Sequence, residues 1–168
     1  MKKQKGFSLI ELLIVVAIIL IIAAIAIPNL LRSKMAANES SAVGSIRTIN
    51  TAQVTFSSAY GIGYTSLASL STPVGGCVGA TSTGACLLDS NLGGGTKSGY
   101  NFTSAAAGGA GTTASPNVTF DSVAWPVALG QTGQNAFCSD ESGVIRRDTG
   151  GTAGPGALCE TSSLPPLQ

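Results

Sequence analysis

The chain has 168 residues, of which 44% are hydrophobic and only 10% are charged. This length favours a single domain, and the formal net charge of +1 gives no electrostatic basis for binding nucleic acid. The sequence contains no histidine, and we find no acid–base pair, no nucleophile–histidine pair and no cofactor motif. We therefore predict that the protein is not an enzyme and holds no cofactor.

The N-terminal stretch has the composition of a membrane span. Three lysines lie within the first five residues, and sixteen apolar residues without a charge run from Leu12 to Ile27. With residues 7–10 included, this segment approaches the ~20 residues that an α-helix needs to cross the hydrocarbon of a bilayer. The lysines favour a cytoplasmic location for this end of the span.

Glu11 places a carboxylate near the start of this span. An acid inside a membrane costs about 2.5–3.5 kcal/mol on insertion scales, so such a residue is a candidate functional group. If helices stack parallel and staggered, the Glu11 carboxylate of one chain can lie near the N-terminal amine of another, and pairing offsets much of the cost of burying both charges. The alternative is that the side chain extends to the membrane interface.

The basic leader, Gly6, Phe7, Glu11 and Pro28 together resemble the class III signal of type IV prepilins and the related pseudopilins. The resemblance covers residues 1–32. It implies that a prepilin peptidase cuts between Gly6 and Phe7 at the cytoplasmic face and methylates the new amine of Phe7. It also implies that the apolar segment is retained, first as a membrane anchor and later as the core of a filament.

Two other interpretations of the N-terminus stay open. An ordinary secretory signal peptide has the same basic and apolar regions, and the triplet Ala24-Ile25-Ala26 would permit cleavage after Ala26. Glu11 argues against it because an acid would interrupt the apolar region, and the helical pattern continues past Pro28. The second alternative is a plain, uncut membrane anchor, which has no use for Glu11.

The helical pattern continues to Tyr60, and Gly61 and Gly63 supply a stop. Apolar residues recur at helical spacing along one stripe, with Gln53 filling a gap: Met35, Ala42, Ile46, Ile49, Phe56 and Tyr60. A continuous helix from Phe7 to Tyr60 would be about 80 Å long, so its first half must be covered by lipid or by other subunits. Pro28 is expected to kink or locally melt this helix.

After Tyr60 the sequence indicates a loop-rich stretch over residues 61–98 and then β-structure. Alternating segments predict strands at Tyr100–Thr103 and Val118–Val123, with an edge at Pro126 and a hairpin formed by 136–139 and 144–147. The sequence thus predicts an α+β fold. A long N-terminal α-helix, half transmembrane and half amphipathic, packs on a small antiparallel sheet of three to four strands, which is the lollipop layout of pilins.

The four cysteines are Cys77, Cys86, Cys138 and Cys159. An even number of cysteines in the part of an anchored chain that lies outside the cytoplasm suggests disulfides, and four cysteines allow three pairings. Proximity favours Cys77–Cys86 with Cys138–Cys159, but the sequence alone does not choose. The spacing lacks C-x-x-C pairs, which argues against a metal site.

Other candidate ligand sites are weak. The glycines at 93–95 lack the motif of a phosphate-binding loop, and Asp140 and Glu141 are interpreted as solvated turn residues, because too few oxygens converge there to bind calcium.

These observations divide the chain into a cleaved leader (1–6), a transmembrane or filament-core helix (7–28), an amphipathic helix (29–60) and a disulfide-containing β-sheet head (61–168). The resemblance implies a structural subunit of a type IV pilus, used for surface attachment, motility or DNA uptake. Its implied partners are other pilins, the prepilin peptidase, an inner-membrane platform and an assembly ATPase. The subunit would be held in the inner membrane with its head in the periplasm, and would become extracellular in the pilus.

The alternative within the family is a pseudopilin of a type II secretion system. The alternative from a different class is a membrane-anchored binding domain that never polymerises.

Overall fold

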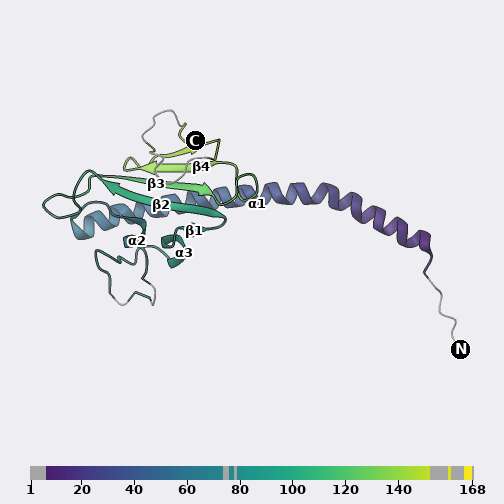
Figure 1. The fold of residues 1–168 in the computed structure, drawn as a ribbon, viewed down its shortest axis with the longest axis horizontal. Helices are drawn as coiled ribbons and strands as arrows, with labels where there is room; N and C mark the ends of the chain where they lie inside the picture. Colours follow the sequence, from purple (N-terminus) through teal and green to yellow (C-terminus); the bar gives the residue numbers. More distant parts are fainter. Residues whose placement is uncertain (1–6, 74–75, 78, 152–158, 160–164, 168) are drawn as a thin grey trace. The chain divides into compact units, whose positions relative to one another are not determined.

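The computed structural model describes residues 7–73, 76–77, 79–151, 159 and 165–167 (Figure 1). By its internal contacts the chain divides into two compact units, Met1–Lys34 and Met35–Gln168. The first helix, α1 (Leu9–Tyr60), has 52 residues and contributes to both units. Each unit is described by itself.

Helix α1 is continuous across Pro28, so the local melting expected at this proline does not occur in the structure. A kink there stays a prediction. The helix ends where the sequence predicts, because Gly61 adopts a left-handed φ of 66° and donates its N–H to the carbonyl of Ser57 at 3.0 Å. A side chain at position 61 would make this conformation costly.

From Met35 onward α1 buries one face. The predicted stripe is confirmed, since all its members are buried except Tyr60, which is partly buried against the same core. The buried residues of the helix are Met35, Ala42, Ser45, Ile46, Ile49, Ala52, Gln53 and Phe56. The recurrence of these positions every three or four residues gives a single apolar face, as expected for a helix that covers a sheet.

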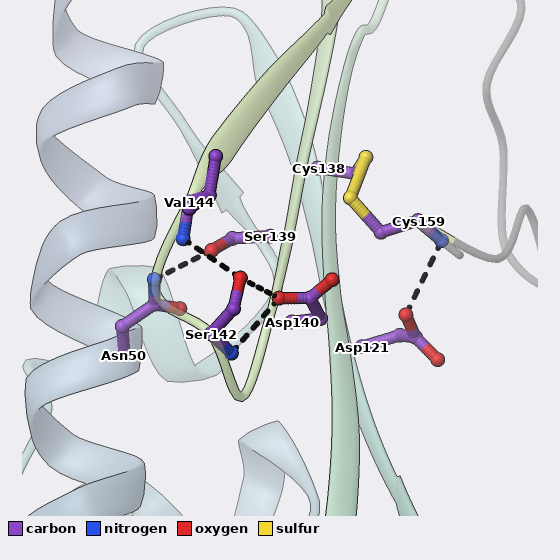
Figure 2. The surroundings of a disulfide bond; sticks show 8 residues. All are labelled: Asn50, Asp121, Cys138, Ser139, Asp140, Ser142, Val144 and Cys159. Carbon is purple, nitrogen blue, oxygen red and sulfur yellow. Dashed lines mark hydrogen bonds between the residues drawn. A yellow bond between two sulfur atoms is a disulfide. The ribbon is translucent and has the colours of Figure 1, made fainter. Parts of the chain in front are cut away.

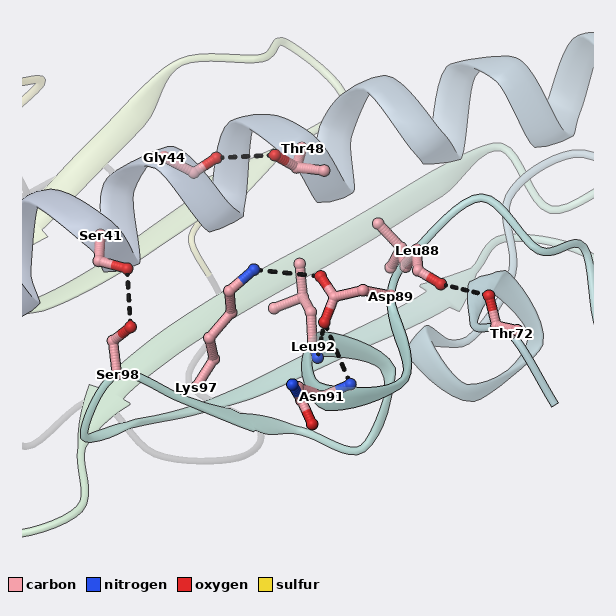
Figure 3. Close-up of polar contacts among 10 residues, drawn as sticks. All are labelled: Ser41, Gly44, Thr48, Thr72, Leu88, Asp89, Asn91, Leu92, Lys97 and Ser98. Carbon is pink, nitrogen blue, oxygen red and sulfur yellow. Dashed lines mark hydrogen bonds and ion pairs between the residues drawn. The ribbon is translucent and has the colours of Figure 1, made fainter. Parts of the chain in front are cut away.

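Two short helices lie in the stretch that the sequence indicates as loops. They are α2 (Leu67–Leu70) and α3 (Ser90–Gly93). Asp89 caps α3 by accepting the N–H groups of Asn91 at 3.1 Å and Leu92 at 2.9 Å, and it pairs with Lys97 at 3.1 Å (Figure 3). Helices of one turn carry too weak a periodic pattern to be predicted, although Asp89 is a typical N-cap residue.

The sheet has five antiparallel strands in the order β1-β2-β3-β4-β5. They are β1 (Thr96–Lys97), β2 (Tyr100–Ala107), β3 (Thr119–Pro126), β4 (Ala136–Asp140) and β5 (Ile145–Asp148). The α+β layout and the terminal hairpin β4–β5 are confirmed. The strand number exceeds the predicted three to four because β1, with two residues, is too short to show alternation.

Two details of the strand prediction are wrong. Pro126 does not mark an edge, because β3 lies between β2 and β4. The proline is tolerated as the last residue of its strand, opposite Tyr100. The strand β2 also continues to Ala107 through small residues whose composition is typical of a loop.

The two faces of the sheet bury different clusters. The face toward α1 packs Tyr100, Phe102, Ala124 and Phe137 against the helix. The opposite face holds a small cluster of Val123, Cys138 and Cys159, with Trp125 packed against it. The adjacent residues Val123 and Ala124 belong to opposite clusters, which is the alternation of a strand covered on both faces.

The structure contains the disulfide pairing that proximity favours. Cys77 is bonded to Cys86, nine residues away, and Cys138 on β4 is bonded to Cys159, 21 residues away. Figure 2 shows the second bond on the side of β4 that faces away from Asn50 of α1. It therefore ties the C-terminal part of the chain to the sheet face that the helix leaves uncovered.

Candidate functional site: an apolar helix surface and its carboxylate

Helix α1 begins at Leu9, and the large apolar side chains from Phe7 to Leu31 are all exposed. Leu9 is 80% exposed, Ile18 52% and Leu30 70%. No residue in the most apolar window of this helix is buried, and its length and composition are sufficient for it to cross a membrane. An apolar surface of this extent is stable only when lipid or protein covers it.

Glu11 lies in the first turn of α1 and makes a local hydrogen bond. Its Oε2 accepts the backbone N–H of Ser8 at 2.9 Å. Ser8 and Glu11 have the spacing of a capping box, in which an acid at the third helical position accepts the N–H of the capping residue. The carboxylate thus satisfies one of the backbone donors that the start of a helix leaves unpaired.

The sequence carries a signal for this role of Glu11, since a serine followed three residues later by glutamate before an apolar run is the pattern of a capping box. The contact shows what Glu11 does within one chain. It leaves Glu11 Oε1 without a hydrogen bond inside the described chain.

The other predicted site residues of this segment are Gly6, Phe7 and Pro28. Gly6 lies outside the described residues. Phe7 is 77% exposed, so the described residues leave most of its side chain uncovered. Pro28 lies inside α1 and has no N–H to donate to the preceding turn.

The head attaches to its part of α1 through buried polar side chains. Gln53 is fully buried, and its amide holds the backbone of Thr65 by donating to the carbonyl at 2.6 Å and accepting the N–H at 3.0 Å. The same nitrogen donates to Ser104 Oγ on β2 at 2.9 Å, and Ser104 meets Ser122 on β3 at 3.0 Å. One helix residue therefore connects a loop and two strands.

A second attachment joins α1 to the loop between β3 and β4. Glu39 accepts the N–H of Gln134 at 2.8 Å and that of Asn135 at 3.2 Å, and its other oxygen accepts the Asn135 amide at 2.9 Å. Tyr100 donates its hydroxyl to the Asn135 carbonyl at 2.8 Å, and burial together with the charge of Glu39 raises the pKa of this phenol. These bonds hold the loop against the helix.

Three acids lie together beside the second disulfide. Asp121 on β3 is directly opposite Asp140 on β4, and Glu141 follows in the turn. Asp121 accepts the N–H of Cys159 at 3.2 Å (Figure 2). Burial raises the pKa of Asp121, with Asp140 and Glu141 contributing in the same direction, while the Cys159 hydrogen bond opposes them. Among the described residues, no group of three His, Cys, Asp or Glu side chains could hold a metal ion.

Known proteins that are similar to this chain match it at the N-terminus. The family model of the prokaryotic N-terminal methylation motif matches residues 1–27. The chain is 62% identical over 39 residues to the type IV wide pilus major component PilA4 of Thermus thermophilus, and 48% identical over 54 residues to the type IV major pilin protein PilA of Myxococcus xanthus. Over its N-terminal region, the chain is therefore similar to type IV pilins. No solved structure gives a significant match.

The likeness to these pilins covers a limited part of each chain. The matched regions are 23% and 32% of this chain, and the chain spans only 30% and 24% of the two relatives. The apolar helix and the α+β head that the resemblance implies are both present in this chain.

Proposed function

We propose that the protein is the structural subunit of a type IV pilus filament. The observation that supports this most is the wholly exposed apolar surface of residues 7–34 with one carboxylate in its first turn. Lipid can cover this surface before assembly, and the helices of neighbouring subunits can cover it in a fibre. The names of the two relatives favour a pilus over a secretion pseudopilin.

The subunit first spans the inner membrane with its head in the periplasm. A prepilin peptidase removes residues 1–6 and methylates the amine of Phe7, and an assembly platform driven by an ATPase adds the subunit to the fibre. In the fibre the Glu11 carboxylate pairs with the Phe7 amine of a neighbour. This pairing gives each charge a partner in an apolar core, and it fixes the stagger of adjacent helices. The protein has a structural role and no enzymatic one.

The experiment compares Glu11→Ala with Glu11→Gln. Glutamine retains an oxygen that can accept the Ser8 N–H, but it cannot pair as an anion with an amine. We expect both variants to be processed and inserted in the membrane at wild-type levels, and both to yield few fibres on shearing. If Glu11→Gln gives normal fibres while Glu11→Ala does not, the carboxylate serves only to cap the helix, and the pairing is refuted.

A further inference from the structure

The charges of the head are almost all satisfied within the chain. Asp89 pairs with Lys97, Glu39 binds the β3–β4 loop, and Asp140 accepts the N–H and hydroxyl groups of Ser142. Of the charged side chains from residue 35 onward that the structure describes, three have no hydrogen bond or ion pair: Arg47, Glu141 and Arg147. All three are exposed.

Arg47 and Arg147 lie together at one side of the head. Arg47 on α1 and Arg147 on β5 both line a groove of about 480 Å³, whose apolar lining includes Val43, Phe137 and Leu167. Glu39 also reaches this groove, but both its carboxylate oxygens are occupied by the β3–β4 loop. The free charge of the groove is therefore positive. We call it the arginine groove.

Glu141 lies elsewhere, in the turn between β4 and β5. Arg147 is opposite Phe137, and Asp140 is three residues further along β4, about 10 Å at 3.3 Å per residue. Asp140 and Glu141 form what we call the acidic tip of the hairpin. Asp121 adds a third negative charge beside it, and the mutual repulsion of these acids contributes to the raised pKa of Asp121. A cation placed at the tip would relieve that repulsion.

We propose that the acidic tip of one subunit docks in the arginine groove of a second copy of this chain. This contact rests on the proposed function. The tip and the groove are different surfaces, so the contact is heterologous: it leaves a free tip and a free groove at the two ends of every pair. A contact of this kind repeats into an open array unless the rotation closes a ring. In the fibre this contact between the heads of neighbouring subunits would add to the packing of their apolar helices. The opposite charges of the two surfaces would select the orientation in which a new subunit binds.

The test is charge reversal followed by charge exchange in the full chain, with sheared fibres as the readout. We expect Glu141→Lys and Arg147→Glu each to lower fibre yield about fivefold, the upper range for an exposed ion pair. The double variant Glu141→Lys/Arg147→Glu restores opposite charges across the contact, and we expect its yield to recover. Lys97→Glu is the matched control for Arg147→Glu, because it changes the net charge by the same amount away from both surfaces, at the cost of the exposed ion pair with Asp89.

The outcomes separate this contact from the proposed function. If wild-type and reversed chains give equal yields of fibres, the protein still forms a pilus but the contact is overturned, and the groove is free for another partner. If single reversals lower the yield but neither the exchange nor co-expression of the two single variants restores it, the yield does not depend on opposite charges at the two surfaces and the contact is again overturned. Co-expression is decisive because it restores opposite charges only between chains, whereas the exchange would also restore an attraction within one head. If the wild type itself forms no fibres, the proposed function fails, and the contact fails with it.

Discussion

Gln53 on α1 and Ser104 on β2 are joined by a hydrogen bond of 2.9 Å between side chains that are 0% and 6% exposed. The bond lies inside the core between the helix and the sheet, where an unpaired polar group is costly. Gln53 also holds both polar groups of the Thr65 backbone. Its amide is therefore one of the points at which the helix fixes the position of the head.

We predict that Gln53→Ala lowers the free energy of unfolding by about 1–3 kcal/mol, because it leaves the part-buried backbone of Thr65 without its partner and Ser104 with Ser122 alone. Thermal or denaturant unfolding of the full-length protein in detergent measures the change. Thr48→Ala is the control, since Thr48 is exposed and bonds only to the carbonyl of Gly44 in its own helix (Figure 3). Equal losses from both variants would contradict the role assigned to Gln53.

Glu39 is expected to matter for the loop between β3 and β4. Glu39→Ala removes all three acceptor contacts to Gln134 and Asn135, and we predict a loss of about 1–3 kcal/mol in the free energy of unfolding. Glu39→Gln keeps one acceptor oxygen and should lose less. Hydrogen exchange at the Gln134 and Asn135 amides is the direct measurement. Unchanged protection in Glu39→Ala would show that the loop is held by other contacts.

The raised pKa of Asp121 predicts a pH dependence of stability. The folded state binds this proton more tightly than the unfolded state, in which the pKa is about 4. Stability is therefore lost as the pH rises from the unfolded pKa through the folded one. Asp121→Asn retains an oxygen that can accept the Cys159 N–H and removes the charge. We expect it to unfold at a higher temperature than the wild type at neutral pH, and the difference to shrink near pH 4.

Asp89 is a control for the pH dependence of stability, because its pKa is shifted in the opposite direction to that of Asp121. Its pKa is lowered, mainly by the hydrogen bond from the Leu92 N–H, with Lys97 contributing. Its stabilising effect is therefore present above the unfolded pKa and is lost as the pH falls through the lower folded value. Asp89→Asn should lower stability at neutral pH, not raise it. The same sign of change in both variants would contradict the assignment of these environments.

The two disulfides are predicted to differ in importance. Cys138→Ser/Cys159→Ser opens a loop of 21 residues and releases Cys159 from the cluster with Val123, whereas Cys77→Ser/Cys86→Ser opens one of nine. Loop-closure entropy alone makes the longer bridge worth more, within a range of roughly 2–4 kcal/mol for each. Melting temperatures of the two double variants compare them directly. A larger loss from the shorter loop would mean that the tail contributes little to the sheet.

Patterns of strong periodicity were predictable from sequence, and single contacts were not. The stripe from Met35 to Tyr60 repeats over seven helical turns and so identifies the buried face of α1 without further information. The hairpin around Asp140–Gly143 was predictable because alternating segments flank a turn sequence. By contrast, α2, α3 and β1 have two to four residues each, which is too few to show a period.

The tertiary partners of polar residues could not be read from sequence at all. Gln53 was visible as a member of the stripe, but its bonds to Thr65 and Ser104 depend on how the chain returns to the helix. The missing N–H of Pro126 predicts an edge, yet its place at the end of β3 makes that donor unnecessary. Glu11 was recognised as significant, while its bond to Ser8 was missed although the capping pattern was present.

The central claim is that this chain is processed at Phe7 and assembled into fibres through its apolar helix. The most direct measurement is the intact mass of the protein in fibres sheared from the surface of the cells that produce it. We predict an abundant species that begins at N-methylated Phe7 and is four hydrogens lighter than the reduced chain, because both disulfides are formed. A chain that begins at Ile27 would lack the helix core and would contradict the account.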